Sequence, residues 1–352
     1  MKRFGHVYEK IYEDDNIDRA IRTGCRNRKN KKEVAEFKEH LDEYRKRMIY
    51  EIKTETFRIA GYHEFRIVEN GKTRIIRKVS LYDAIVLNAF CQVLEPFVDK
   101  KLTPESHGAR KGHGTHSAMR AVFKHLQHPK ANYVLQTDVE GFFKNMDPNV
   151  TKQKIRKVFK DPKIIRFFDN LIDSYPDGET PIGNRTSPML ANLYLRDVLF
   201  ALSNRYKVHM FTNYVDDTII HGFSKKWLHF ILNVYRKLLA EIKLKIKSNY
   251  QVYPVEPRGV DFVGWVIHKD YIHIRKRTKL KMIKAARRMY AKMKKGIEPT
   301  VHDRSSIGSY VGMLRWCNGY RLYCKYLRPI VRYFKAWDKR KAYIKKASPG
   351  AI

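Results

Sequence analysis

The sequence predicts an α+β fold, and three observations lead to that prediction. Short apolar runs end on acidic residues or flank turn residues, which is typical of antiparallel strands joined by hairpins. Elsewhere, apolar residues recur at three- and four-residue spacing, which is typical of helices that bury one face. The chain of 352 residues is 43% hydrophobic and contains 22 Tyr and 18 Phe, enough for a packed core in two or three subdomains.

The first part of the chain is predicted to be helical. Residues 6–21 are expected to form a helix, and residues 23–32 a polar, basic loop. A second helix follows, because apolar residues repeat at helical spacing and place one stripe against the body of the protein. The residues of this stripe are Val34, Phe37, Leu41, Tyr44 and Met48.

A β-hairpin is predicted next, since residues 65–68 and 73–76 flank Asn70-Gly71, a strong signal for a two-residue turn. The strands alternate apolar and cationic residues. We expect three cations to project toward one groove while two apolar residues pack the other way. The cations are Arg66, Lys72 and Arg74, and the apolar residues are Ile67 and Ile75.

Further helices are predicted along the chain. Residues 82–98 are expected to form one, followed by a Gly-rich basic loop over residues 107–116. Residues 227–246 are expected to form an amphipathic helix that passes into a strand at its end. Three basic helices and a frayed tail complete the chain, over residues 275–295, 305–320, 323–337 and 339–352.

The tetrapeptide Tyr214-Val215-Asp216-Asp217 lies between two apolar stretches, at the tip of a predicted strand-turn-strand. Adjacent carboxylates repel each other, so a turn that presents both at the end of a sheet favours a divalent-metal site. A solvated turn is the alternative, because Asp is common in hairpin turns. His221 lies close by, and it either contacts the metal site or packs in the second strand.

A third carboxylate is predicted to lie beside this pair. Residues 133–138 form an apolar strand that ends on Asp138. Between this strand and the acidic turn, residues 180–195 form a Gly-containing loop that leads into an apolar helix. Thr186 or Ser187 is expected to cap this helix, with Pro188 in its first turn, where a missing N–H does no harm.

Composition points to a polyanionic partner. The chain has 72 Lys and Arg against 36 Asp and Glu, a formal charge of +36. Neutralising phosphates would make binding strong and salt-dependent, and aromatic residues in the basic segments favour base stacking. A composition that only serves solubility is the alternative. Membrane binding is not expected, because no apolar run approaches the ~20 residues of a spanning helix and no signal peptide is visible.

The four cysteines predict no metal site. They show neither CxxC spacing nor a matching His pattern, so a zinc site is not expected and reduced thiols in the cytosol are favoured. The cysteines are Cys25, Cys91, Cys317 and Cys324.

The order of these motifs resembles the palm of reverse transcriptases: a strand that ends in Asp138, a Gly-xxx-Ser-Pro loop, Tyr-Val-Asp-Asp, and Phe-Val-Gly-Trp at residues 262–265. The resemblance extends over residues 44–326. Among the intron- and retron-like enzymes, the chain is most similar to reverse transcriptases of diversity-generating retroelements, because Ile182 stands where related enzymes carry Gln. Ser187-Pro188 departs from that family, which usually continues with Ser-Gln, and agrees with intron and retroviral enzymes.

The resemblance implies a right-hand polymerase with fingers, a palm built on an antiparallel sheet with helices, and a helical thumb. The expected domains are residues 1–125 for an N-terminal extension and fingers, 126–272 for the palm, and 273–352 for the thumb and basic tail. An endonuclease or RNase H segment is not expected after the tail.

The resemblance also implies catalysis by two Mg²⁺ ions. Asp138 and Asp216 are expected to bridge ions ~3.5–4 Å apart, with Asp217 as a weaker ligand and the Val139 carbonyl as a further oxygen. Backbone N–H groups of residues 140–143 are expected to face the nucleotide phosphates, because Gly141 permits close approach.

Nucleotide recognition is implied for a larger set of residues. Arg74 falls where the family binds the triphosphate, although a solvent-facing charge on an edge strand is the alternative. Phe143 is expected to exclude a 2′-hydroxyl unless both it and Phe142 belong to the core, and Ile182 to lie against the nascent base pair. The nucleotide-binding set is Arg66, Lys72, Arg74, Arg110, Gly141, Phe142, Phe143, Ile182 and Gly183.

A second implied set contacts the primer or nucleic acid. Gly264 and Trp265 resemble a primer-grip hairpin, although core packing accounts equally well for the Trp. Lys247 is a candidate acid for the leaving pyrophosphate, and Arg110 is expected to face the template strand or the nucleotide. The primer-contacting set is Tyr214, Lys247, Gly264 and Trp265.

The resemblance implies an RNA-directed DNA polymerase that copies a template-repeat RNA into cDNA, with errors at adenine, for mutagenic retrohoming. Its expected partners are template RNA, the cDNA duplex, dNTPs and a small, basic, helical accessory protein. It is expected in the cytoplasm, encoded by a bacterium, an archaeon or a phage. The alternatives are a retron-type or antiphage-defence reverse transcriptase, or a non-catalytic RNA-binding scaffold, which retention of all three carboxylates opposes.

Overall fold

The computed structural model describes residues 3–26, 32–69 and 71–347. The chain packs into two compact units. Unit 1 comprises residues 1–114 and 133–253, and unit 2 comprises residues 115–132 and 254–352. The division into fingers, palm and thumb at residues 125 and 272 stays a prediction, since these units follow different boundaries.

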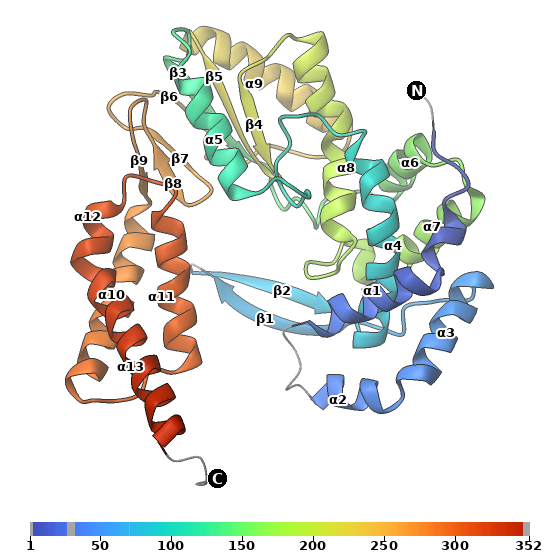
Figure 1. The fold of residues 1–352 in the computed structure, drawn as a ribbon. Helices are drawn as coiled ribbons and strands as arrows, with labels where there is room; N and C mark the ends of the chain where they lie inside the picture. Colours follow the sequence, from blue (N-terminus) through green and yellow to red (C-terminus); the bar gives the residue numbers. More distant parts are fainter. Residues whose placement is uncertain (1–2, 27–31, 70, 348–352) are drawn as a thin grey trace. The chain divides into compact units, whose positions relative to one another are not determined.

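The core of unit 1 contains a four-stranded antiparallel sheet (Figure 1), as expected for an α+β fold. Its strand order is β4-β5-β3-β6. The strands are β3 (Tyr133–Asp138), β4 (Phe211–Tyr214), β5 (Asp217–Gly222) and β6 (Gln251–Pro254). His221 is fully buried opposite Val134, so the alternative in which it packs in the second strand is confirmed.

Helices cover this sheet and extend its core. The helix α9 (Lys225–Ala240) begins at Ser224, whose hydroxyl accepts a hydrogen bond from the Trp227 amide at 3.2 Å, and it packs on β3 and β5. The helix ends at Ala240, and Ile246 pairs with Val139 as a short extension of the sheet, in agreement with the predicted passage from helix to strand. The other helices are α4 (Leu81–Asp99), α6 (Pro148–Val158), α7 (Pro162–Asp173) and α8 (Ser187–Phe200), with single turns at Pro176–Gly178 and Ala201–Arg205.

Among the described residues, α4 alone is long and apolar enough to cross a membrane by length and composition, contrary to the expectation from the sequence. However, 67% of its apolar window is buried inside the structure. It begins at Ser80, whose hydroxyl accepts from the Asp83 amide at 3.0 Å. Its burial is that of a central core helix.

The N-terminal helices differ from the prediction in where they break. Residues 6–21 contain a short turn, Tyr8–Ile11, and then α1 (Asp14–Cys25), which continues into the predicted loop. The predicted second helix is two helices, α2 (Lys32–Glu39) and α3 (Leu41–Lys53), because His40 leaves the helical conformation. Residues 27–31 of the predicted basic loop lie outside the described residues.

The predicted hairpin is present as β1 (His63–Glu69) and β2 (Lys72–Lys78), with Asn70 of its turn outside the described residues. Arg66 pairs with Ile75, and Ile67 pairs with Arg74. Residues directly opposite on antiparallel strands share a face, so Arg66 lies on the face opposite Arg74. The prediction that the cations share one groove while Ile67 and Ile75 pack the other way is therefore wrong, because Arg66 shares a face with Ile75 and Arg74 shares a face with Ile67.

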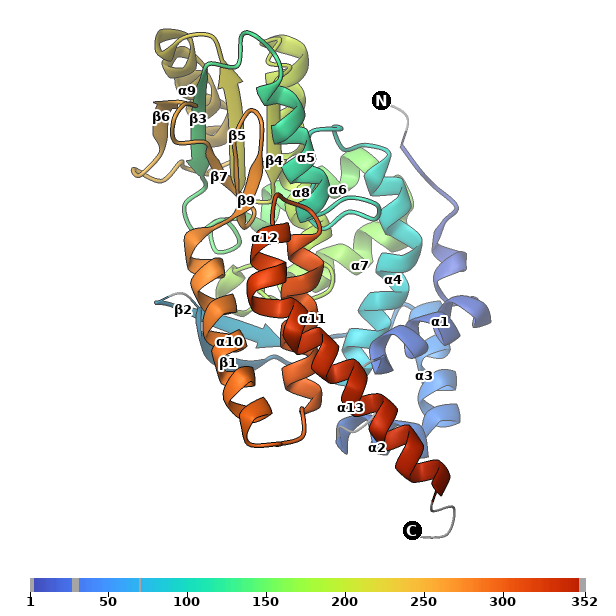
Figure 2. The ribbon, with the colours of Figure 1, turned by 60° about the vertical axis from the view of Figure 1, so that its left-hand side comes forward.

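Unit 2 combines a small sheet with helices (Figure 2). The strands β7 (Val260–Phe262), β8 (Trp265–Ile267) and β9 (Ile272–Ile274) form an antiparallel sheet. Its helices are α5 (Thr115–Leu126), α10 (Lys276–Lys294), α11 (Val301–Leu314), α12 (Tyr320–Leu322), a turn at Tyr323–Leu327 and α13 (Arg328–Ala347). The frayed tail predicted from residue 339 is wrong up to residue 347, where α13 ends, and residues 348–352 lie outside the described residues.

Candidate active site

The acidic turn connects β4 to β5 in a strained conformation. Val215 has φ of 58°, a left-handed value that is rare for a β-branched residue. Asn213 is 1% exposed, and its amide nitrogen donates to the Val215 carbonyl and the Thr218 hydroxyl, each at 3.0 Å. A buried side chain therefore holds the turn from inside, which is how strained backbone persists at functional sites.

A loop behind the turn fixes its position. The His107 amide donates to the Asn213 carbonyl at 2.9 Å, and the Asn192 side chain donates to the Gly108 carbonyl at 2.7 Å. A Cβ atom on Gly108 would lie 2.9 Å from the Val215 backbone nitrogen. Only glycine therefore allows this loop to pack directly on the turn. Sequence reasoning missed Asn192 and Asn213, since nothing local distinguishes them from other core amides.

Two carboxylates lie together at the end of the sheet. β3 pairs with β5 so that Asp138 is opposite Asp217, and the Val139 amide donates to the Asp216 carbonyl at 3.2 Å. Burial, and then the charge of Asp138, raise the pKa of the Asp216 carboxyl above its ordinary value. Asp217 is exposed. We call Asp138 and Asp216 the carboxylate pair, in which the charge of Asp138 disfavours ionisation of Asp216.

Lys247 lies on the other side of Asp138. The Lys247 amide donates to the Asp138 carbonyl at 2.9 Å, and its ammonium forms an ion pair with Asp138 Oδ2. Asp138 Oδ1 is buried and has no hydrogen-bond partner among the described residues. The structure therefore brings Lys247 to the predicted catalytic carboxylates, and it leaves one carboxylate oxygen unsatisfied.

These residues fit Mg²⁺ as donors, because hard cations prefer carboxylate oxygens and a cation would relieve the repulsion within the pair. In the part of the chain that the structure describes, no three His, Cys, Asp or Glu side chains are gathered closely enough to hold an ion as they stand. The donor set is therefore the carboxylate pair. Coordination by Asp217 and by the Val139 carbonyl stays a prediction.

The turn after β3 carries the residues predicted to face the nucleotide. Gly141 has φ of 51°, and the Asn145 side chain donates to the Glu140 carbonyl at 2.8 Å. The amides of residues 141–143 have no hydrogen-bond acceptor within the described residues, as required for a phosphate-facing loop. The Glu140 amide does not fit this prediction, because it donates to the Lys245 carbonyl at 2.8 Å.

The two Phe side chains in this turn differ in burial. Phe142 is 4% exposed within the core, whereas Phe143 is only partly buried and packs against the core edge. Phe142 therefore belongs to the buried core, whereas Phe143 lies at its edge. The exclusion of a 2′-hydroxyl by Phe143 stays a prediction.

The loop that contains Ile182 and Gly183, which we call the Gly loop, packs against the β1–β2 hairpin. The Ile182 carbonyl accepts from the Arg77 amide at 3.0 Å, and a Cβ on Gly183 would lie 3.0 Å from Ile76 Cγ2. Arg74 is two residues from Ile76 on β2 and so shares its face. Arg74 therefore lies on the side of the hairpin that meets this loop. The side chain of Lys72 lies outside the description.

Two local predictions for this loop are corrected. Thr186 occupies the N-cap position of α8, but its side chain makes no capping bond and instead donates to Asn184 Oδ1 at 3.2 Å. The Ser187 hydroxyl donates to the Pro181 carbonyl at 2.7 Å. Both hydroxyls therefore hold the loop instead of capping the N-terminus of α8. Pro188 lies in the first turn of the helix, as predicted.

Arg110 does not face a nucleotide or a template strand. Its guanidinium bonds to Asp99 at 2.6 Å and to the carbonyls of Thr103 and Ser106 at 2.8 and 2.6 Å. Its side chain is 8% exposed. The prediction is wrong because these partners, which precede Arg110 by four to eleven residues, use the guanidinium to close the loop on itself.

The predicted primer grip lies in unit 2. Gly264 has φ of 101° in the β7–β8 turn, close to Met313. Trp265 is 3% exposed, with its ring centroid 5.3 Å from that of His116, which stacks on Trp316 at 4.4 Å. Core packing therefore accounts for Trp265, and the prediction that it offers a surface to the primer is wrong. Tyr214, at the end of β4 in unit 1, is partly buried, and burial raises its pKa.

Comparisons with known proteins agree with these motifs. Residues 66–267, more than half of the chain, match the family described as reverse transcriptase (RNA-dependent DNA polymerase). An uncharacterized 91 kDa protein in the cob intron of Schizosaccharomyces pombe is 24% identical over 162 residues, which cover 43% of this chain and 20% of that protein. The mitochondrial nuclear intron maturase 1 of Arabidopsis thaliana is 27% identical over 108 residues, covering 29% and 15%. The chain thus spans a fifth or less of the length of these curated relatives.

Solved structures include telomerases among similar chains. Apo telomerase from Candida tropicalis, truncated from its C-terminal domain, has a TM-score of 0.48 at 13% identity, covering 62% of this chain and 55% of that one. Telomerase from Candida albicans with a fragment of telomeric RNA has a TM-score of 0.48 at 11% identity, covering 80% and 56%. Because the family match covers more than half of the chain, this protein belongs to the reverse transcriptase (RNA-dependent DNA polymerase) family and has its α+β right-hand polymerase fold.

Proposed function

We propose that the chain is an RNA-directed DNA polymerase, which extends a DNA 3′ end by copying an RNA template. The observation that carries the proposal is the carboxylate pair, in which Asp216 has a raised pKa and Asp138 keeps a buried oxygen without a partner. Such a pair gains most from binding a cation. The family match supports nucleotidyl transfer as the reaction.

Asp138 and Asp216 would hold two Mg²⁺ ions, with Asp217 beside them. When bound, these ions lower the pKa of the attacking hydroxyl and screen the leaving pyrophosphate. The free amides of residues 141–143 would donate to the phosphates, and Arg74 would bind the triphosphate from the hairpin. Lys247 already lies against Asp138, where an ammonium can donate a proton to a departing phosphate.

The charge of the chain supports a nucleic-acid template as the partner. Unit 2 carries a helix, α10, whose sequence is rich in Lys and Arg and contains no Asp or Glu, and Lys292 of that helix forms an ion pair with Asp303 at 2.7 Å. Such an excess of cations favours binding to a phosphate backbone, with affinity that falls steeply as salt rises.

A diversity-generating retroelement is the biological setting that we propose. Ile182 is partly buried in the Gly loop, and its aliphatic side chain cannot donate a hydrogen bond to the nascent base pair. Without that hydrogen bond, the geometry of the nascent base pair would be less constrained and misinsertion would be favoured. The proposed product is therefore cDNA copied from a template-repeat RNA with errors at adenine. A small basic accessory protein would assist, in the cytoplasm of a bacterial, archaeal or phage-infected cell.

Primer extension on an RNA template with purified protein and Mg²⁺ tests the proposal, run with and without the neighbouring non-coding RNA and gene product. Synthesis by the wild type, and none by Asp216→Asn, is the expected result. Sequencing the cDNA should show errors concentrated opposite adenine, and fewer in Ile182→Gln. Accurate cDNA would favour a retron-type or antiphage-defence enzyme, and RNA binding without synthesis under any condition would favour the non-catalytic scaffold.

A further inference from the structure

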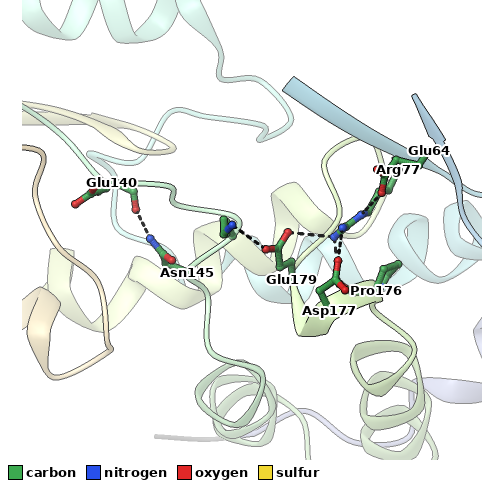
Figure 3. Close-up of polar contacts among 8 residues, drawn as sticks. Glu64, Arg77, Glu140, Asn145, Pro176, Asp177 and Glu179 are labelled. Atoms are coloured by element: carbon green, nitrogen blue, oxygen red, sulfur yellow. Dashed lines mark hydrogen bonds and ion pairs between the residues drawn. The ribbon is translucent and has the colours of Figure 1, made fainter. Parts of the chain in front are cut away.

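Arg77 is an unusual residue for the end of a two-stranded hairpin. It is only 7% exposed, although β1 and β2 form a sheet of two strands. Its guanidinium donates to Glu64 at 3.0 Å, to Asp177 at 2.6 Å and to Glu179 at 3.2 Å, and also to the Pro176 carbonyl at 3.1 Å (Figure 3). We call Arg77, Glu64, Asp177 and Glu179 the Arg77 cluster.

The contacts of Arg77 join two separate segments. Glu64 is its cross-strand partner within the hairpin, but the other three acceptors lie about a hundred residues farther along the chain, in residues 176–179. That segment leads directly into the Gly loop. The Arg77 amide bonds to the Ile182 carbonyl at 3.0 Å, so side chain and backbone of one residue both hold the hairpin to the loop.

The cluster continues toward the carboxylate pair. The second carboxylate oxygen of Glu179 forms an ion pair with Lys144 at 3.3 Å. Lys144 lies between Phe143 and Asn145, and Asn145 bonds to the Glu140 carbonyl in the turn that follows Asp138 (Figure 3). One connected set of contacts thus runs from the hairpin to the turn that carries Phe143 and the free amides.

We propose that Arg77 is a positioning residue for the incoming nucleotide, which holds the hairpin, the Gly loop and the turn over residues 140–145 in one geometry through Glu179 and Lys144. The inference rests on the proposed function, because these three elements are the ones expected to contact the nucleotide. Arg77 touches no reacting atom. Planar guanidinium binding is required, since a point charge cannot reach three carboxylates and a carbonyl at once.

The chain offers a matched set of variants. Glu179→Gln removes the link from the hairpin to the turn, and Lys144→Met removes the same link from its other end. Glu64→Gln neutralises a carboxylate whose contact with Arg77, of similar length, stays inside the hairpin, so it is the control. Arg77→Lys keeps the positive charge but loses the planar set of guanidinium donors. Glu179 and Lys144 side chains are 27% and 72% exposed, so these variants should fold even if Arg77→Lys does not.

Steady-state primer extension would measure KM for dNTP, kcat and the preference for dNTP over rNTP. We expect Glu179→Gln and Arg77→Lys to raise KM about tenfold with kcat within about twofold, and to relax the dNTP preference. Glu64→Gln should leave all three unchanged. In the double variant with Lys144→Met, Glu179→Gln should add no further effect, because both changes break one link. Equal effects of Glu64→Gln and Glu179→Gln would overturn the proposal, since they would indicate a general loss of stability.

Hydrogen exchange separates failure of this inference from failure of the proposed function. Exchange of the Glu140 and Asn145 amides, which bond to the carbonyls of Lys245 and Gly141, needs no catalysis. We expect Glu179→Gln to raise exchange in residues 140–145 about tenfold and Glu64→Gln not to. If the wild type makes no DNA, this result alone still decides whether the link exists, and unchanged exchange in Glu179→Gln would overturn it.

Discussion

The carboxylate pair and the Arg77 cluster are two acidic sites in unit 1 that differ in how well the chain itself compensates their charges. In the Arg77 cluster, one buried guanidinium has an acceptor for each of its nitrogen atoms, and the carboxylates of Asp177 and Glu64 reach water, with side chains 73% and 47% exposed. In the carboxylate pair, burial raises the pKa of Asp216 and one oxygen of Asp138 has no described partner. The first site is complete within the chain, whereas the second has only Lys247 against Asp138 and would gain from a cation supplied from outside the chain.

This difference predicts that neutralising a charge does opposite things at the two sites. At Asp216 of the carboxylate pair, it should abolish function and relieve the fold. At the Arg77 cluster, it should destabilise the fold by leaving charges uncompensated. The following changes test that contrast.

The largest effect is expected for Asp138→Asn. An amide cannot hold a divalent cation as a carboxylate does, and loss of several kcal/mol of transition-state stabilisation should lower the rate of nucleotide addition on the order of 10³-fold. Single-turnover extension with preformed template and primer measures this rate. Circular dichroism should show an unchanged fold, and activity within tenfold of the wild type would contradict a metal role for the pair.

Arg77→Met should give the largest loss of stability. It removes the cation that pairs with all three carboxylates of the cluster. We expect a cost of about 3 kcal/mol, at the low end for a broken buried ion pair, because water reaches two of the carboxylates. Urea unfolding would measure it. Glu64→Gln should cost less than about 1 kcal/mol, and equal losses for the two variants would show that the guanidinium is not the centre of the cluster.

Gly108→Ala should disturb the carboxylate pair by geometry instead of charge. Its Cβ would approach the Val215 nitrogen to 2.9 Å and displace the acidic turn. A shift on the order of 1 Å at a reacting centre lowers kcat by roughly 10²-fold. Gly308→Ala, in α11, is the control, because nothing lies within 4 Å of its added Cβ and its backbone is helical. If both variants retain kcat, the loop does not position the turn.

The acidic turn and its strands were predictable because their signals are local. Alternation along β3 and β5 and the turn chemistry around Asp216 follow from residues within a few positions. The faces of the hairpin were mispredicted because even-numbered residues of both strands were expected on one face. Across a two-residue turn, even-numbered residues of one strand instead share a face with odd-numbered residues of the other, as Arg66 does with Ile75.

The supporting contacts were not predictable for a different reason. Arg77 meets Asp177 and Glu179 across about a hundred residues, and Asn192 reaches Gly108 across 84. No local pattern marks such partners, since their value appears only when the fold brings them together. Arg110 shows the converse error, because a basic residue in a Gly-rich loop resembled a ligand contact and instead closes its own loop.

The smallest expected effect concerns the stability of the metal-free protein, and it tests the contrast most directly. Since the folded-state pKa of Asp216 is raised, the folded chain holds that proton more strongly than the unfolded chain. Its favourable contribution is present below the ordinary carboxyl pKa and is lost as pH rises through the raised value. Asp216→Asn never ionises, so at neutral pH in EDTA its Tm should exceed that of the wild type by a few degrees, and the difference should vanish in acid.

Mg²⁺ should raise the Tm of the wild type and leave that of Asp216→Asn nearly unchanged, because only the wild type recovers the lost stability by binding the ion. Thermal scans across pH, with EDTA and with Mg²⁺, measure both effects in the full chain. A lower Tm for Asp216→Asn at neutral pH would mean that Lys247 already neutralises the pair. In that case the carboxylate pair would resemble the Arg77 cluster, and the chain itself would supply the cation that we assign to the metal.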